Sequence, residues 1–93
     1  MATKTNTTHE MIITGTNAAD SIVNHGHDVT ISTGNGDDTV KNIWYEDYYD
    51  NDNGINSASY VSINTGAGND SVYNDLGWYC TINTGAGNDS VFN

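Results

Sequence analysis

Glycine and aspartate recur together at a fixed spacing that could present oxygen ligands to a cation. The turn Gly-x-Gly-x-Asp occurs at residues 34–38, 66–70 and 85–89, and a weaker copy ends at Asp20. Glycine permits positive φ, so successive carbonyl groups of such a turn can point to one side, and the aspartate adds a carboxylate. Calcium binds about 6–8 oxygens and accepts peptide carbonyls readily. One turn supplies too few oxygens, so we expect neighbouring turns, stacked about 4.8 Å apart, to share each ion.

The turns belong to a longer repeat that predicts a stacked fold. Residues 65–74 and 84–93 are identical at nine of ten positions, and residues 33–42 form a third copy. Between the turns lie short alternating segments, at 29–32, 61–64 and 80–83, each with two apolar positions on one face. Two strands and two turns in 18 or 19 residues make one coil of a solenoid. The aspartates that mark successive coils are Asp20, Asp38, Asp70 and Asp89, separated by 18, 32 and 19 residues.

We therefore predict an all-β fold, a right-handed parallel β-roll or β-solenoid of about four coils, in which equivalent residues stack in parallel. Residues 1–8 are expected to form a polar N-terminal tail. Residues 9–93 are expected to form a single repeat domain, with an acidic, tyrosine-rich loop inserted at about 45–57. Two sets of side chains should point inward: Val29, Ile31, Val61, Ile63, Cys80 and Ile82 from one strand set, and Ile22, Val40, Val72 and Val91 from the other.

The composition limits the function. The chain has 93 residues, one cysteine and a formal charge of −10, and ten of its twelve acidic residues are aspartates. Nucleic acids and anionic membranes are poor partners for such a chain, and no segment is long and apolar enough to span a membrane. The N-terminus lacks the apolar stretch of a signal peptide. We therefore expect a cytosolic chain, a piece of a larger protein, or export by a route that needs no N-terminal signal.

The turns resemble the nonapeptide Gly-Gly-x-Gly-x-Asp-x-apolar-x of the RTX family, the hemolysin-type calcium-binding repeats. Residues 34–40, 66–72 and 85–91 match it from its second position, with threonine in place of the first glycine. The resemblance implies calcium held between neighbouring turns by carboxylates and peptide oxygens. The implied ligands belong to Asp20, Gly34, Asn35, Gly36, Asp38, Gly66, Ala67, Gly68, Asp70, Gly85, Ala86, Gly87 and Asp89.

Two departures from the family pattern limit this prediction. The opposite turns, at 24–28 and 74–78, do not match the repeat, so a second column of calcium ions is not expected. The first repeat has Thr16 and Ala18 where the pattern has glycine, so its site should be the weakest.

The predicted function is that of a calcium-binding module that folds when it binds calcium. Without metal, stacked aspartates repel one another, and a thin core at this net charge should stay largely unfolded. Metal binding then supplies folding free energy. The resemblance implies a part of a larger secreted or surface bacterial protein, extracellular in location and commonly exported by type I secretion. No arrangement of nucleophile, base or paired carboxylates suggests an enzyme.

Several alternatives remain. A metal-free solenoid held by asparagine and threonine ladders would need no ion. An ice-binding or carbohydrate-binding solenoid could use a threonine array or the aromatic residues, which could also bind a protein partner. His9, His25 and His27 could bind a transition metal, although no third ligand is identifiable and exposed turn histidines are expected. Residues 50–54 resemble part of an EF-hand loop, but that register puts a tyrosine at both the first and the last ligand position.

Overall fold

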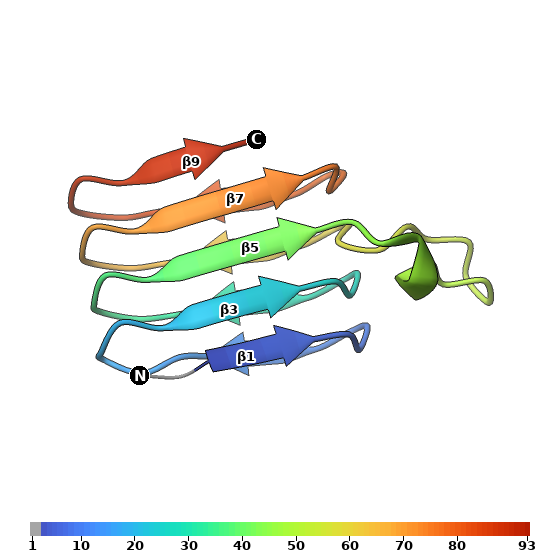
Figure 1. Ribbon diagram of the computed structural model, residues 1–93, viewed down its shortest axis with the longest axis horizontal. Helices are drawn as coiled ribbons and strands as arrows, with labels where there is room; N and C mark the ends of the chain where they lie inside the picture. The colour runs from blue at the N-terminus through green and yellow to red at the C-terminus, as the bar shows by residue number, and fades with distance from the viewer. Residues whose placement is uncertain (1–2) are drawn as a thin grey trace.

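The computed structural model describes residues 3–93 and contains two parallel sheets (Figure 1). Five strands form one sheet, in the order β1 (Thr3–Asn6), β3 (Ser21–Asn24), β5 (Thr39–Ile43), β7 (Ser71–Asp75) and β9 (Ser90–Phe92). Four strands form the other, in the order β2 (Ile12–Thr14), β4 (Thr30–Ser32), β6 (Ser62–Asn64) and β8 (Thr81–Asn83). Successive strands alternate between the sheets, as in a solenoid.

The chain winds as a right-handed parallel β-roll, which confirms the predicted fold class. Each of four coils contributes one strand to each sheet, and β9 is the first strand of a fifth coil. The molecule measures 38 × 22 × 15 Å along its principal axes. Among residues 3–93 the only helical element is the short 3-10 helix η1 (Glu46–Tyr48), so no helix in this part of the chain could cross a membrane.

The core is a single layer of aliphatic side chains between the sheets. The predicted stacking is confirmed, because Val72 is in register with Val91 and Ile63 with Ile82. The members of this core cluster, each at most 5% exposed, are Ile13, Ile22, Val29, Ile31, Val40, Val61, Ile63 and Val72. Burying one such side chain contributes about 1.5–3 kcal/mol, so this narrow stack is the main apolar contribution to stability.

Some core predictions need correction at the outer coil. Cys80 and Ile82 pack against the core cluster but are only partly buried, and Val91 is 46% exposed. The reason is their position, since β8 and β9 are the outermost strands of their sheets and each has a neighbour on one side only. Ile13, which the sequence pattern did not place among the inward residues, is buried against its register partner Ile31.

The N-terminal segment adds a strand that its polar sequence does not reveal. Thr3–Asn6, within the segment expected to be a tail, form β1 and pair with β3. Lys4 lies opposite Ile22, and no residue of β1 is fully buried. Backbone pairing therefore defines this strand, rather than the burial of an apolar face.

A ladder of asparagine side chains closes one end of every coil. The Asn6 amide donates to Asn24 Oδ1, and the same contact links each member to the next, with distances of 2.7–2.8 Å. A primary amide both donates and accepts, so stacked asparagines satisfy one another. The members of this asparagine ladder are Asn6, Asn24, Asn42, Asn74 and Asn93.

Candidate metal centre at the glycine turns

The glycine-containing turns stack directly on one another at the left-hand edge of Figure 1. The Gly36 amide donates to the Ala67 carbonyl at 3.0 Å, and the Gly68 amide donates to the Ala86 carbonyl at 3.1 Å. The predicted calcium-binding residues thus occupy equivalent positions in successive turns. The equivalent sets are Gly34, Gly66 and Gly85; Asn35, Ala67 and Ala86; Gly36, Gly68 and Gly87; and Asp20, Asp38, Asp70 and Asp89.

Close approach of the turns requires glycine at the second conserved position. Gly68 has φ +127° and Gly87 has φ +118°, values that residues with a side chain rarely adopt. A Cβ atom on Gly68 would collide with the carbonyl oxygen of Gly36, and one on Gly87 would collide with that of Gly68. Peptide oxygens of one turn therefore face the backbone of the next, which places oxygen ligands between coils.

The aspartate column (Asp20, Asp38, Asp70 and Asp89) lies at the start of β3, β5, β7 and β9. Asp38 Oδ1 accepts the backbone N–H of Asp20 at 2.8 Å, and Asp70 Oδ1 accepts that of Asp38 at 2.9 Å. Asp89 Oδ1 accepts the Asp70 N–H at 2.9 Å. Each of these carboxylates therefore has one oxygen bonded to the preceding coil.

The second oxygen of the two central carboxylates is the unusual feature. Oδ2 of Asp38 and of Asp70 is buried and has no hydrogen-bond partner among residues 3–93. Burial raises the pKa of Asp38, as do the charges of Asp70 and Asp20, although hydrogen bonding from the Thr33 hydroxyl and the Asp20 amide opposes the shift. The Thr33 hydroxyl also donates to the Thr65 carbonyl at 3.2 Å, so its one hydrogen is not available to Asp38 alone. A buried carboxylate oxygen in this state is costly unless a proton or a cation reaches it.

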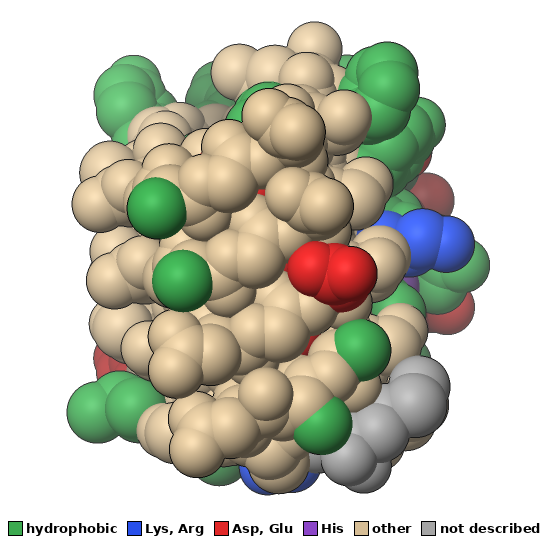
Figure 2. Space-filling view, turned by 90° about the vertical axis from the view of Figure 1, so that its left-hand side faces the viewer, with side chains coloured by type: hydrophobic (Ala, Val, Ile, Leu, Met, Phe, Trp, Pro, Cys, Tyr) green, Lys and Arg blue, Asp and Glu red, His purple; other side chains and the backbone are tan. Residues whose placement is uncertain are grey.

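Figure 2 views the molecule onto this edge, and little acidic surface is visible there. Backbone and uncharged polar side chains cover most of it, with a few separate hydrophobic side chains. The small acidic surface is consistent with the exposed fractions of Asp20, Asp38 and Asp70, which are 2%, 1% and 2%. The carboxylates are thus enclosed by the turns, and an ion that they bind would lie inside the stack.

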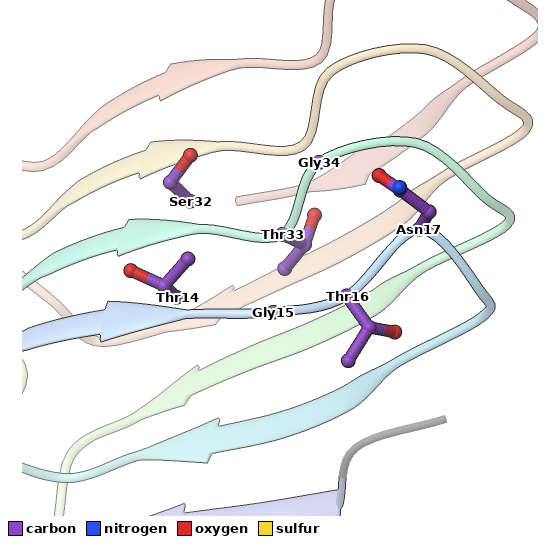
Figure 3. A pocket seen from close by; sticks show the side chains of 7 residues that line it. All are labelled: Thr14, Gly15, Thr16, Asn17, Ser32, Thr33 and Gly34. Atoms are coloured by element: carbon purple, nitrogen blue, oxygen red, sulfur yellow. The ribbon is translucent and has the colours of Figure 1, made fainter.

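The first turn differs from the others, as its sequence predicts. Thr16 stands in place of a glycine, and its amide donates to Asp20 Oδ2 at 2.7 Å while its hydroxyl donates to Asp20 Oδ1 at 2.8 Å. Both carboxylate oxygens of Asp20 therefore accept hydrogen bonds from its own turn. A groove of about 280 Å³ lies between this turn and the next, lined by residues 14–17 and 32–34 (Figure 3).

A second ladder at this edge was missed by the sequence analysis. Asp37 Oδ1 accepts the Asn69 N–H at 2.8 Å, and Asn69 Oδ1 accepts the Asn88 N–H at 3.0 Å. The signal was available, because the residue before the final aspartate is aspartate or asparagine in three of the four turns. These exposed side chains bond between coils, and they hold the turns in register.

The histidine turns at the opposite end need a correction. His27 is fully buried and His25 is 6% exposed, against the expectation of exposed turn histidines. The inserted loop covers them: Tyr45 and Tyr48 stack on the His25 ring, with centroids 4.4 Å and 5.2 Å away. Sequence spacing gives no indication that this loop folds back onto the turn.

The inserted loop also supplies a third candidate metal ligand, Asp50, beside two of the histidines. Donor atoms of His9, His27 and Asp50 lie within 4.8 Å of one another. However, His9 Nδ1 accepts the His27 backbone N–H at 3.0 Å, so a neutral His9 carries its hydrogen on Nε2 and has no free lone pair. The His9 and His27 rings are also stacked, with centroids 4.0 Å apart, rather than converging edge-on. These contacts favour hydrogen bonding over metal ligation at this cluster.

Three further aromatic residues gather beside the last two coils. Tyr60 and Tyr79 stack with centroids 5.2 Å apart, and with Trp78 they line a depression of about 220 Å³. All three are at least half exposed. Cys80 lies under this region, where burial raises the pKa of its thiol, and its Sγ lies 3.2 Å from the Ala58 carbonyl. The thiol is therefore a poor nucleophile.

Comparison of the chain with protein-family models, with curated proteins and with solved structures gave no match. The interpretation of the site consequently depends on its own geometry. The glycine turns offer oxygen ligands alone, which suits a hard cation such as calcium rather than a transition metal.

Proposed function

We propose that this chain is a calcium-binding β-roll module whose folded state is stabilised by ions bound between its glycine turns. The observation that supports it best is the pair of buried, unpartnered oxygens, Asp38 Oδ2 and Asp70 Oδ2, in neighbouring coils. Ionised carboxylates stacked in this way repel one another, and a divalent cation relieves both the repulsion and the lost hydration.

The two ends of the coil support the same proposal by contrast. The asparagine ladder needs no ion, because each amide donates to the next. A carboxylate can only accept, so the aspartate column must take its donors from elsewhere. Backbone N–H groups satisfy Oδ1. Oδ2 is left for a proton or a cation, and only a cation satisfies it while the carboxylate stays ionised.

The ligands would come from successive turns. Asp38 and Asp70 would supply carboxylate oxygens, with Asp89 and the peptide oxygens of the glycine-containing turns completing the set. Bound calcium supplies positive charge that links neighbouring coils. The net charge of −10 favours cation uptake in general.

The wider setting follows from the resemblance to RTX repeats alone. On that basis we propose a part of a larger secreted or surface bacterial protein, which folds where calcium is abundant and is not an enzyme. A protein or carbohydrate partner at the exposed aromatic residues stays a prediction. An ice-binding role is less favoured, because Thr33 and Thr65 of the supposed threonine array are fully buried.

A calcium titration tests the proposal. Isothermal calorimetry should detect saturable binding, and thermal unfolding followed by circular dichroism should shift upward with calcium and return in EDTA. At a calcium concentration 100 times Kd, one site adds about 2.7 kcal/mol to the free energy of unfolding. Magnesium at the same concentration should stabilise less, because it holds its water and demands octahedral geometry.

The alternative is a metal-free solenoid, and one observation favours it: the inter-coil hydrogen bonds of the aspartate column and the asparagine ladder form without an ion. Under this alternative the unfolding curve in EDTA coincides with that in calcium. Such a result would reject the calcium proposal.

Substitutions should rank the sites. Asp70→Ala is expected to weaken calcium binding more than Asp20→Ala, because Asp20 already accepts two bonds from Thr16 whereas Asp70 Oδ2 has no partner. Asp70→Asn keeps the acceptor for the Asp38 N–H but removes the charge, so it should also weaken binding. The measurement is the calcium Kd of each variant by calorimetry. Equal losses at residues 20 and 70 would refute this ranking.

A further inference from the structure

The His27 side chain lies between two carboxylates at the end of the coils opposite the aspartate column. Its Nδ1 is 2.6 Å from Asp28 Oδ2, and its Nε2 is 2.7 Å from Asp50 Oδ2. Carboxylates accept hydrogen bonds, so both ring nitrogens must carry hydrogen for both contacts to form. The geometry is therefore that of a protonated imidazolium, buried at 0% exposure.

Asp50 connects this imidazolium to the inserted loop, residues 45–57. Its Oδ1 accepts the backbone N–H groups of Asp52 and Asn53, and its backbone forms a bridge with Ile55. These bonds hold the carboxylate in the turn at the tip of the loop. Within residues 3–93, the pairs of His27 with Asp28 and Asp50 are the only ion pairs, so the loop has a single ionic contact with the coils.

The rest of the loop is attached by contacts without an ion pair. The Tyr45 amide donates to the Ser57 hydroxyl at 2.8 Å, which closes the base of the loop. Tyr45 and Tyr48 stack on His25, whose Nδ1 lies 2.8 Å from the Ile43 carbonyl. Stacked aromatic pairs contribute about 0.5–1.5 kcal/mol each, and the His27–Asp50 pair is the ionic contact that acts beside them.

We propose that the proton on His27 is a latch: while it is present the inserted loop is docked on the coils, and its loss releases the loop. Deprotonated His27 can donate from only one nitrogen, so either Asp28 or Asp50 then faces a lone pair across a short contact. Release exposes the His25 ring on which Tyr45 and Tyr48 stack.

The charges around His27 set the direction of the pH response. Burial lowers the pKa of His27, but hydrogen bonds to Asp50 and Asp28 and their charges outweigh it, so the pKa is raised. Burial and the neighbouring His27 lower the pKa of His9, which stacks as a neutral ring, with Glu10 beside it. The hydrogen bond from His27 holds the pKa of Asp50 well below its usual range, so Asp50 stays ionised. Ser59, which follows His27 in the next coil, brings no charge.

The sign of the effect follows from linkage. His27 is protonated more readily in the docked state, so docking is fully supported below the ordinary histidine pKa of about 6.5. It weakens as pH rises through the raised pKa of the docked state. Between about pH 6.5 and that raised pKa the docking equilibrium should fall by up to about tenfold per pH unit. Above the raised pKa it is constant, because His27 is then neutral in both states.

Nuclear magnetic resonance of the whole chain in saturating calcium tests the latch. The His27 ring shifts give its pKa, and hydrogen-exchange protection of the Tyr45 amide reports docking, with the Ile63 amide in β6 as an internal reference. We expect a His27 pKa above 6.5 and Tyr45 protection that falls about tenfold for each unit by which that pKa exceeds 6.5, with Ile63 unchanged. A His27 pKa at or below 6.5, or constant Tyr45 protection between about pH 5.5 and 9, would overturn the proposal.

Two isosteric variants distinguish a loss of loop docking through His27 from a loss of stability of the whole fold. Asp50→Asn removes the charge on the loop, so its Tyr45 protection should be low at every pH and equal to the high-pH value of the unmodified chain. Asp28→Asn removes the charge on the coil side and suits the positive φ of 54° at this position, so the protein should still fold. It should lower the His27 pKa and move loop release to lower pH. An unchanged release pH in Asp28→Asn would also contradict the latch.

Discussion

Replacing Gly68 by alanine is expected to lower the free energy of unfolding by about 3–6 kcal/mol. Gly68 has φ +127°, and its added methyl group would collide with the Gly36 carbonyl oxygen in the turn below. The obstacle is backbone, which cannot rotate away as a flexible side chain could. The Gly68 amide also donates to the Ala86 carbonyl, so separating the turns on one side disturbs the contact on the other. A chain of this size has about 5–14 kcal/mol of total stability, so the variant should be close to unfolding.

Gly54→Ala is the matched control for this prediction. Gly54 also has positive φ, +68°, but it lies in the inserted loop, and the nearest group that its added methyl would meet is the Tyr49 hydroxyl, at 3.7 Å. Only the backbone preference is then lost, about 1 kcal/mol. Urea unfolding followed by circular dichroism, at one fixed calcium concentration, measures both variants. Equal losses would mean that the stacked turns can separate without penalty.

The sequence predicted the coils because a solenoid repeats its own constraints. Every coil must place an aliphatic residue at the same inward position, and identical neighbours such as Ile63 and Ile82 show this directly in the sequence. The glycine spacing was equally informative, since a Cβ at Gly68 or Gly87 cannot fit. Fold class and register therefore followed from local repetition.

The contacts that the sequence did not predict come from segments outside the repeat. Asp50 belongs to an insertion with no counterpart in other coils, so no spacing rule connects it to His27, 23 residues away. The strand β1 was missed for the opposite reason: Lys4 occupies the position of Ile22, and its apolar signal is absent. Both depend on tertiary contacts that a periodic pattern does not encode.

The asparagine ladder shows why amide and carboxylate are not interchangeable in a stack. Asn24, Asn42 and Asn74 each donate to the next member and to a carbonyl of their own or a neighbouring turn. One atom of each side chain is a donor and the other an acceptor, so every rung fits both neighbours. A carboxylate in the same place would present two acceptors to a neighbour that also presents an acceptor.

Asn42→Asp should therefore destabilise the module by about 3–5 kcal/mol at neutral pH. Asn42 is fully buried, and its Nδ2 donates to Asn74 Oδ1 at 2.8 Å and to the Ala58 carbonyl at 2.9 Å. The substituted carboxylate would face both acceptors without a proton, so its pKa in the folded state should be raised. A raised carboxyl pKa supports folding only below that value, so stability relative to the unmodified chain should recover on acidification and be lost again as pH rises.

Asn93→Asp is the control, because Asn93 only accepts in the ladder, from Asn74 Nδ2 at 2.7 Å, and a carboxylate oxygen can fill that role. Its substitution should change stability by less than about 0.5 kcal/mol. Urea unfolding of both variants at neutral and acidic pH, each compared with the unmodified chain, measures the difference. Similar stability for the two variants at neutral pH would show that donor direction does not matter. In that case, the inability of a carboxylate to donate a hydrogen bond would no longer be a reason for the aspartate column to bind a cation.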